Sequence, residues 1–93
     1  MSDINLVGVI GGGTMGAGIA EMCARSGSSV LILETSQATA DAAEARLDKS
    51  FARAVKSGRI EADAAEKARA AITLTLDMND FADRDLVVEA APE

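Results

Sequence analysis

The feature that most restricts the fold is a cluster of glycines between a short apolar run and a helical pattern. Residues 11–16 read G-G-G-T-M-G, and Gly11, Gly13 and Gly16 fit the pattern G-x-G-x-x-G. Residues 4–10, before it, are almost wholly apolar and partly β-branched, which indicates a strand buried on both faces. Residues 14–27, after it, have helical spacing and end in a glycine. The sequence predicts a strand, a tight turn and a helix.

The rest of the chain continues the alternation of strands and helices. Apolar runs predict strands at residues 29–33, 72–76 and 85–90, and helical patterns cover residues 37–57 and 61–71. Ser36 can cap the longer helix, and Gly58 ends it. Residues 77–84 are expected to form a turn or a helical turn packed by Phe81. Strands that alternate with helices predict an α/β fold with a parallel sheet and right-handed crossovers.

The glycine pattern has a chemical meaning at this position. Gly11 allows a tight turn, Gly13 lets a diphosphate approach the backbone, and Gly16 lets the helix pack closely on the strand. Free N–H groups at the start of the helix would hold that anion without a lysine. Thr14 is expected to cap the helix, and it can also donate to a phosphate. The segment predicts a dinucleotide-binding turn, and the alternative is a turn that serves packing alone.

A single acid follows the second predicted strand. Glu34 lies eighteen residues after Gly16, where a dinucleotide site needs an acceptor for the hydroxyl groups of the adenosine ribose. A carboxylate there repels a 2′-phosphate, and Thr35, Ser36 and Gln37 supply no cation that would neutralise one. The two motifs together favour NAD over NADP. The alternative for Glu34 is a solvated surface acid.

Composition argues against several other classes of protein. The 93 residues carry nine Lys and Arg against fifteen Asp and Glu, a net charge of −6, so no nucleic-acid partner is expected. No apolar run approaches the ~20 residues that span a bilayer, so no membrane partner is expected. A lone cysteine and an N-terminus without a signal pattern favour the cytoplasm. Without histidine the chain offers neither a His-dependent base nor a Cys/His metal site.

Two segments resemble one family of enzymes. Residues 7–20 read V-G-V-I-G-G-G-T-M-G-A-G-I-A and are similar to the opening of the 3-hydroxyacyl-CoA dehydrogenases, whose fingerprint is G-x-G-x-M-G-x-G-I-A. Residues 85–93, D-L-V-V-E-A-A-P-E, look like that family's fourth strand and the following loop. The resemblance implies a Rossmann-type sheet with strand order 3-2-1-4 that binds NAD. It also implies hydride transfer between a 3-hydroxyacyl-CoA, such as 3-hydroxybutyryl-CoA, and its 3-oxoacyl-CoA, in fatty-acid or short-chain acyl-CoA metabolism.

The resemblance also assigns residues to the cofactor. They are Gly11, Gly13, Thr14, Met15 and Gly16 around the turn, Glu34 on the adenosine ribose, and Glu93 on the nicotinamide side. Met15 is also expected in the buried face of the first helix, together with Ile19, Met22 and Cys23. Glu89, within the fourth strand, is expected to be a structural carboxylate that needs a partner if it is buried.

A stripe of basic residues runs along one face of the longer predicted helix. Arg46, Lys49, Arg53 and Lys56 recur at intervals of three, four and three, and they lie nearly opposite the apolar face of Leu47, Phe51, Ala54 and Val55. Residues 46–59 hold five basic residues and one acid, Asp48, which is a local charge of +4. Such a face suits an anionic ligand, and the alternative is a stripe that serves solubility alone.

The family suggests that this ligand is coenzyme A. By resemblance, Ser50 matches a serine that contacts CoA, and Lys56 lies close to the position of a CoA-contacting lysine. Arg53 lies between them on the stripe. We therefore expect Ser50, Arg53 and Lys56 to contact the CoA part of the substrate.

The resemblance covers only the first part of such an enzyme. We expect residues 1–93 to be the N-terminal portion of an NAD-binding Rossmann domain, with the C-terminal helical domain for substrate and dimerisation absent. The catalytic histidine would lie in that absent portion, so no catalytic residue is expected here and this chain alone should be inactive. The intact enzyme is expected to be a homo-oligomer, and the open edge of the fourth strand should make the isolated piece self-associate.

Two other functions stay open at this point. A module that senses NAD without chemistry would need the same turn and the same acid. A related dehydrogenase of small hydroxy acids would also share the glycine loop.

Overall fold

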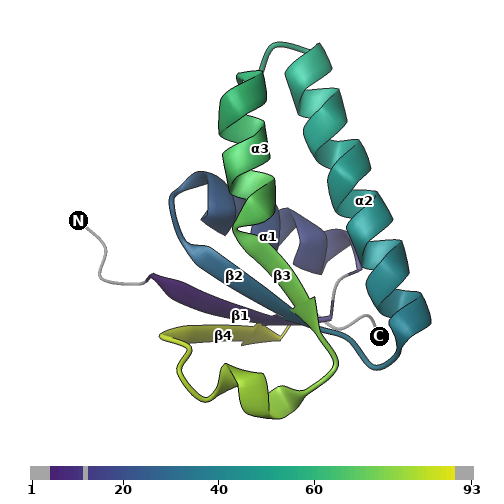
Figure 1. The fold of residues 1–93 in the computed structure, drawn as a ribbon, viewed down its shortest axis with the longest axis vertical. Coiled ribbons are helices and arrows are strands. Elements are labelled where there is room, and N and C mark those ends of the chain that lie inside the picture. The colour runs from purple at the N-terminus through teal and green to yellow at the C-terminus, as the bar shows by residue number, and fades with distance from the viewer. Residues whose placement is uncertain (1–4, 12, 90–93) are drawn as a thin grey trace.

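The computed structural model describes residues 5–11 and 13–89, whose helices and strands are shown in Figure 1. The elements in this part of the chain are β1 (Leu6–Ile10), α1 (Thr14–Arg25), β2 (Ser29–Leu33), α2 (Gln37–Lys56), α3 (Ala62–Ala70), β3 (Ile72–Thr75), the 3-10 helix η1 (Met78–Phe81) and β4 (Leu86–Glu89). Every predicted helix and strand is present in the predicted order. The observed ends lie within two residues of the expected ends.

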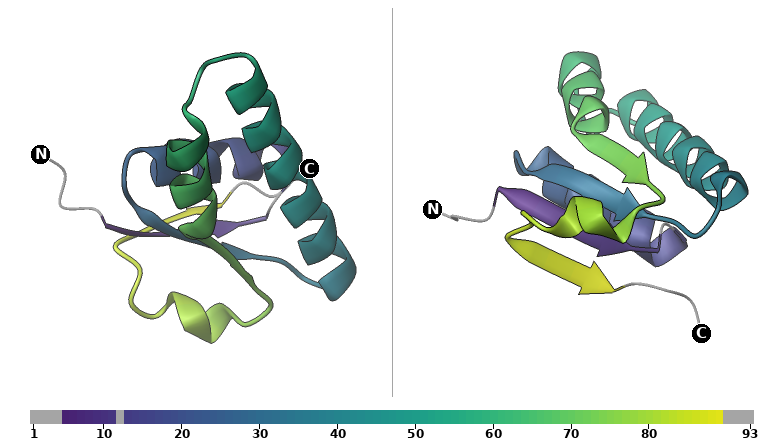
Figure 2. Two further views of the ribbon diagram at one scale, coloured as in Figure 1. Left: turned by 45° about the horizontal axis from the view of Figure 1, so that its top comes forward. Right: turned by 60° about the horizontal axis from the view of Figure 1, so that its bottom comes forward.

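The strands form one parallel sheet in the order β3-β2-β1-β4, which confirms the expected topology. The three α-helices cover one face, and η1 lies against the other (Figures 1 and 2). Phe81 of η1 is buried, as expected, and its ring lies over Gly8 of β1. A Cβ atom at Gly8 would lie 2.7 Å from that ring, so the glycine is what allows η1 to approach the sheet.

The contact face of α1 is built from small residues. Gly16, Ala17, Ala20 and Ala24 are buried against the sheet, and they pack with core residues of β1 and β2. The prediction that Met15 and Met22 join this face is wrong, because their side chains are 70 % and 63 % exposed. At about 100° per residue, both methionines lie on the side of α1 opposite the buried glycine and alanines, so they face solvent. Ile19 and Cys23 pack at the margin of the core, as expected.

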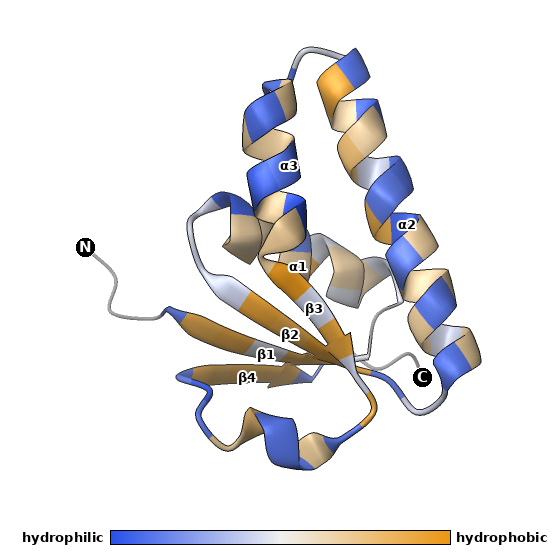
Figure 3. Ribbon diagram, viewed as in Figure 1, coloured by the Kyte–Doolittle hydropathy of each residue, from blue (hydrophilic) through white to orange (hydrophobic). Residues whose placement is uncertain are grey.

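The core of the domain lies between the helices and the sheet. In Figure 3 the strands are the most continuously apolar elements, whereas the helices alternate apolar and hydrophilic residues. Leu47, Phe51 and Ala54 of α2 are buried, and Val55 packs beside them, so the predicted apolar face of this helix is confirmed.

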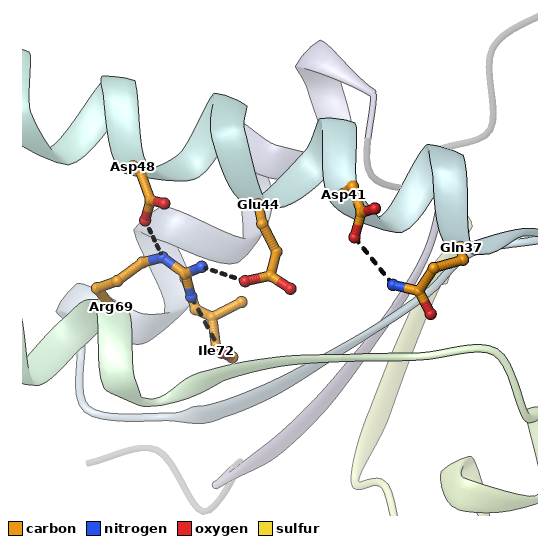
Figure 4. A network of polar contacts seen from close by, with 6 residues as sticks. All are labelled: Gln37, Asp41, Glu44, Asp48, Arg69 and Ile72. Atoms are coloured by element: carbon orange, nitrogen blue, oxygen red, sulfur yellow. Dashed lines mark hydrogen bonds and ion pairs between the residues drawn. The ribbon is translucent and has the colours of Figure 1, made fainter.

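One arginine ties α3 to α2. The guanidinium group of Arg69 donates to Asp48 Oδ1 at 2.7 Å, to Glu44 Oε1 at 3.2 Å and to the carbonyl oxygen of Ile72 at 3.3 Å (Figure 4). Both acids are more than half exposed, so each pair alone contributes little, but the three acceptors fix one geometry. Asp48, the acid within the basic stripe, is thereby turned toward α3.

A carboxylate fastens the start of β4 to the start of β1. Asp85 Oδ2 accepts hydrogen bonds from the backbone N–H groups of Leu6 at 2.9 Å and Asn5 at 3.0 Å. The Asp85 N–H group also donates to the Leu6 carbonyl oxygen at 2.7 Å. The backbone N–H groups of Leu6, which has the larger effect, and of Asn5 hold the pKa of Asp85 below its ordinary value of 3.8, because they stabilise the ionised form.

The substitution Asp85→Asn is expected to destabilise the domain at neutral pH. The pKa of Asp85 is lower in the folded protein than in the unfolded chain. The stabilisation that its carboxylate gives the fold is therefore complete above a pH of 3.8 and is lost as the pH falls through the folded pKa. Thermal unfolding midpoints of the two proteins should therefore differ at neutral pH and converge at the acid end of a titration.

The control is Glu66→Gln on the exposed face of α3, which removes one negative charge without touching β1 or β4. A difference between the Asp85 proteins that stays constant at every pH would contradict the role given to the carboxylate.

Candidate functional site

The carboxyl ends of β1 and β2 place the glycine turn beside Glu34. The two strands pair in register up to Ile10 and Leu33, and the Gly11 N–H group donates to the Leu33 carbonyl oxygen at 2.9 Å. Glu34 follows at once, and its own N–H group donates to the Thr75 carbonyl oxygen of β3 at 2.9 Å. The half-buried acid therefore stands at the same sheet edge as the turn, as the sequence predicts.

The three glycines of the motif meet three different requirements. Gly11 has a φ of 94°, in the left-handed region that favours glycine. A Cβ atom at Gly16 would lie 1.8 Å from the Gly11 carbonyl oxygen, so no other residue fits there. A Cβ atom at Gly13 would meet no atom within 4 Å among the described residues. The middle glycine thus faces open space, where a ligand can approach the backbone.

Among the described α-helices, α1 alone begins with neither a side-chain cap nor an acid in its first turn. Its N-cap is Gly13, which offers no side-chain hydrogen bond, and the first turn carries no acid. The prediction that Thr14 caps the helix is wrong, because Thr14 is already the first helical residue. By contrast, Ser36 and Thr39 form a reciprocal capping box on α2. The N–H groups and the positive dipole end of α1 therefore suit an anion held at the turn.

Met15, expected at the cofactor, and Glu89, expected to be a structural carboxylate, also lie near this edge. The outward side chain of Met15 lies in the first turn of α1, beside the glycines. Glu89 is the last residue of β4 and pairs in register with Ile10. Its side chain is exposed, so it does not need the buried partner considered for it. Glu93 lies outside the described residues.

A groove of about 340 Å³ runs between α1 and α2. Its lining residues are Thr14, Ala17, Gly18 and Glu21 from α1, and Arg46, Lys49, Ser50 and Arg53 from α2. The structure thus brings Ser50 and Arg53 together with two other members of the basic stripe. Lys56, one turn beyond Arg53, does not line this groove. Thr14 links the groove to the glycine turn, because it belongs to both.

Glu21 is a groove residue that the sequence analysis missed. Its Oε1 atom accepts a hydrogen bond from the Ser50 hydroxyl group at 2.5 Å, which joins the two helices. Its Oε2 atom lies 3.8 Å from the Arg25 guanidinium group. The sequence signal that could have identified Glu21 is its spacing. Thr14, Gly18 and Glu21 recur at intervals of four and three, which places them on one side of a helix.

Across the described part of the chain, no group of three or more Cys, Asp and Glu side chains could hold a metal ion. None of the described helices is long and apolar enough to cross a membrane.

A glycine turn, an uncapped helix start and an acid at the tip of the next strand define the dinucleotide-binding part of a Rossmann-type domain. The comparison with protein families agrees with this class. Residues 6–93 match the family described as "3-hydroxyacyl-CoA dehydrogenase, NAD binding domain", and the chain belongs to that family. Its cofactor is accordingly NAD.

Curated proteins and solved structures of this family are similar along the whole chain. A 3-hydroxybutyryl-CoA dehydrogenase of Mycobacterium tuberculosis is 45 % identical over 94 aligned positions, which cover 100 % of this chain and 33 % of that protein. The crystal structure of FadB2 from M. tuberculosis superimposes with a TM-score of 0.95 and 42 % identity, over 99 % of this chain and 32 % of that one. The crystal structure of the (S)-3-hydroxybutyryl-CoA dehydrogenase PaaH1 from Ralstonia eutropha superimposes with a TM-score of 0.91 and 34 % identity. The match covers 98 % of this chain and 32 % of that one. The chain spans about a third of these relatives.

Alanine in place of Gly16 should mainly reduce stability, whereas alanine in place of Gly13 should mainly weaken NAD binding. Gly16→Ala is expected to cost about 3 kcal/mol or more of stability, because its Cβ atom would overlap the Gly11 carbonyl oxygen. Gly13→Ala should cost no more than about 1 kcal/mol, because its backbone is extended and its surroundings are open. The same Gly13 substitution should weaken NAD binding about tenfold, since the added methyl group occupies the path of the diphosphate.

Urea denaturation and calorimetric titration with NAD would measure the two effects. An equal loss of stability in both variants, or unchanged NAD affinity in the folded Gly13→Ala protein, would contradict this description of the turn.

Proposed function

We propose that this chain is the cofactor-binding part of an enzyme that interconverts 3-hydroxyacyl-CoA and 3-oxoacyl-CoA by hydride transfer, in fatty-acid or short-chain acyl-CoA metabolism. The observation that carries the proposal is the open, uncapped start of α1 beside Glu34, in a chain of this family. The similarity to 3-hydroxybutyryl-CoA dehydrogenases supports a short acyl chain on the substrate.

Those residues proposed to hold NAD that the structure describes lie along the carboxyl edge of the sheet. The N–H groups that follow Gly13 bind the diphosphate, at a backbone that Gly11 and Gly16 hold in place, with Thr14 and Met15 in the first helical turn. Glu34 accepts hydrogen bonds from the adenosine ribose hydroxyl groups and disfavours a 2′-phosphate, which selects NAD over NADP. Glu93 is proposed to contact the nicotinamide side. NAD, when bound, supplies the acceptor for the hydride.

The residues proposed for the CoA part of the substrate lie on α2. Ser50 and Arg53 line the groove between α1 and α2, together with Arg46 and Lys49. The positive charges of this helix attract the phosphates of CoA to a chain that is negative as a whole. Lys56 is proposed as a contact at the far end of the same stripe.

The proton acceptor of the reaction is not among these residues. The chain contains no histidine, so we infer that the base which takes the hydroxyl proton is contributed by another part of the enzyme, and that these 93 residues are inactive alone. We further propose, from the resemblance to this family, that the intact enzyme is a homo-oligomer. The isolated 93 residues should self-associate through the open side of β4, where Leu86 and Val87 are 41 % and 45 % exposed. A cytoplasmic location is proposed from the lone Cys23.

The direct test is turnover by the protein that contains this chain. Purified protein given 3-hydroxybutyryl-CoA should reduce NAD, which is followed by the absorbance of NADH, and should act far more slowly with NADP. Protein that binds NAD and shows no turnover with any 3-hydroxyacyl-CoA would refute the enzymatic proposal and favour an NAD-sensing role.

The acid at the ribose should control cofactor choice. Glu34→Ala is expected to weaken NAD binding by roughly 1 to 3 kcal/mol, through the loss of hydrogen bonds to an ionised acceptor. NADP binding should be unchanged or improved, because the charge that opposes its 2′-phosphate is removed. Titrations with both cofactors measure the change, and equal affinity for NAD and NADP in the unaltered protein would disprove the assignment.

Reversal of one charge in the groove should weaken CoA binding. Arg53→Glu is expected to reduce the affinity for CoA about tenfold or more, by replacing attraction for its phosphates with repulsion. The matched control is Lys67→Glu on α3, which makes the same change of charge outside the groove between α1 and α2. Calorimetry with NAD present would reveal the difference, and equal losses in the two variants would show that only net charge matters.

A further inference from the structure

The groove between α1 and α2 combines groups of opposite charge. Arg46, Lys49 and Arg53 line its α2 side, whereas Glu21 supplies a carboxylate from α1. The Glu21 side chain is only 15 % exposed, so most of it is packed against the protein and little of it reaches into solvent. A site that bound phosphate alone would gain nothing from an acid at this place, because the acid repels the ligand.

The Glu21 carboxylate fixes the role of the neighbouring hydroxyl group. A carboxylate can only accept hydrogen bonds, so the single hydroxyl hydrogen of Ser50 points at Glu21 Oε1, 2.5 Å away. Ser50 Oγ then has only its lone pairs left for a ligand in the groove. A phosphate oxygen placed there would face two sets of lone pairs and a negative charge, whereas a ligand N–H or O–H group would find an acceptor.

The cations occupy different positions along the same wall. Lys49 precedes Ser50 by one residue and Arg53 follows it by one helical turn, so a positive group flanks the hydroxyl on each side along α2. Phosphates are attracted to these flanks and kept away from the centre. The groove therefore discriminates between parts of a ligand that carries both phosphates and hydrogen-bond donors.

We propose that Glu21 determines the specificity of this groove: it turns Ser50 into a hydrogen-bond acceptor, so that a hydroxyl or amide group of the ligand docks at Ser50 while the phosphates dock at Lys49 and Arg53. This inference rests on the proposed function of the groove as the site of the CoA moiety. Coenzyme A carries hydroxyl and amide donors beside its phosphates, which is the combination that the groove requires.

The test compares coenzyme A with inorganic pyrophosphate, which carries phosphate charge but none of the sugar hydroxyl and amide groups of coenzyme A. Both are titrated calorimetrically into the protein that contains this chain, with NAD saturating the cofactor site. Glu21→Gln keeps the size of the side chain and an oxygen that accepts from Ser50, but removes the charge, so the fold is retained. Glu66→Gln on α3 removes the same charge away from the groove.

Glu21→Gln should tighten pyrophosphate binding about three- to tenfold, and Glu66→Gln should change it less than about twofold. Ser50→Ala should weaken CoA binding about fivefold or more, through the lost hydrogen bond, without weakening that of pyrophosphate. Equal weakening of both ligands by Ser50→Ala, or equal effects of the two glutamate substitutions, would overturn the role of Glu21.

The role of Glu21 and the binding of CoA in the groove are distinguished by separate results. CoA binding that is sensitive to Arg53→Glu but unaffected by Ser50→Ala, together with pyrophosphate binding that Glu21→Gln leaves unchanged, would refute only the role of Glu21. If neither ligand binds to the unaltered protein, the assignment of the groove to CoA and the inference built on it both fall.

Discussion

The approach of α1 to the end of β1 governs the rest of this domain. At Gly16 the helix comes so close that a single methyl group would overlap the carbonyl oxygen of Gly11. That distance explains why the buried side of α1 consists of glycine and alanine. It also sets where the first N–H groups of the helix lie relative to Gly13. The binding edge is thus a consequence of backbone packing, and it needs no charged side chain in the turn.

The same close packing positions both sides of the proposed ligand path. Because α1 rests on β1 and β2, its start lies beside the tip of β2, where Glu34 stands. Because α2 packs through Leu47 and Phe51, its basic residues border the groove along α1. Cofactor edge and groove meet at Thr14, the first residue of the helix that they share.

Much of this arrangement could be predicted from sequence because it follows from local rules. The glycine spacing and the apolar runs predict a strand, a turn and a helix, and parallel strands bring their carboxyl ends to one edge. The position of Glu34 follows directly, since it comes immediately after a strand in register with β1. The buried face of α2 also repeats with the period of its helix, so that Leu47 and Phe51 were identified from spacing alone.

The features that escaped prediction depend on distances between elements. Helical spacing groups Met15 and Met22 on one side of α1, but it does not show which side meets the sheet, and the buried side carries glycine and alanine instead. The bond between Ser50 and Glu21 joins residues 29 positions apart, and no local pattern pairs them. Arg69 likewise finds its acceptors on another helix.

Asp85 has a consequence for the order in which the molecule can assemble. Its carboxylate binds the N–H group of a residue 80 positions earlier, so β4 reaches its place only when nearly the whole described sequence is available. During synthesis on a ribosome, residues 6–34 emerge before β4, and they already contain the turn and Glu34. The segment that is proposed to hold the nucleotide is therefore complete before β4 docks, and a ligand bound at that stage would favour the native pairing of the strands.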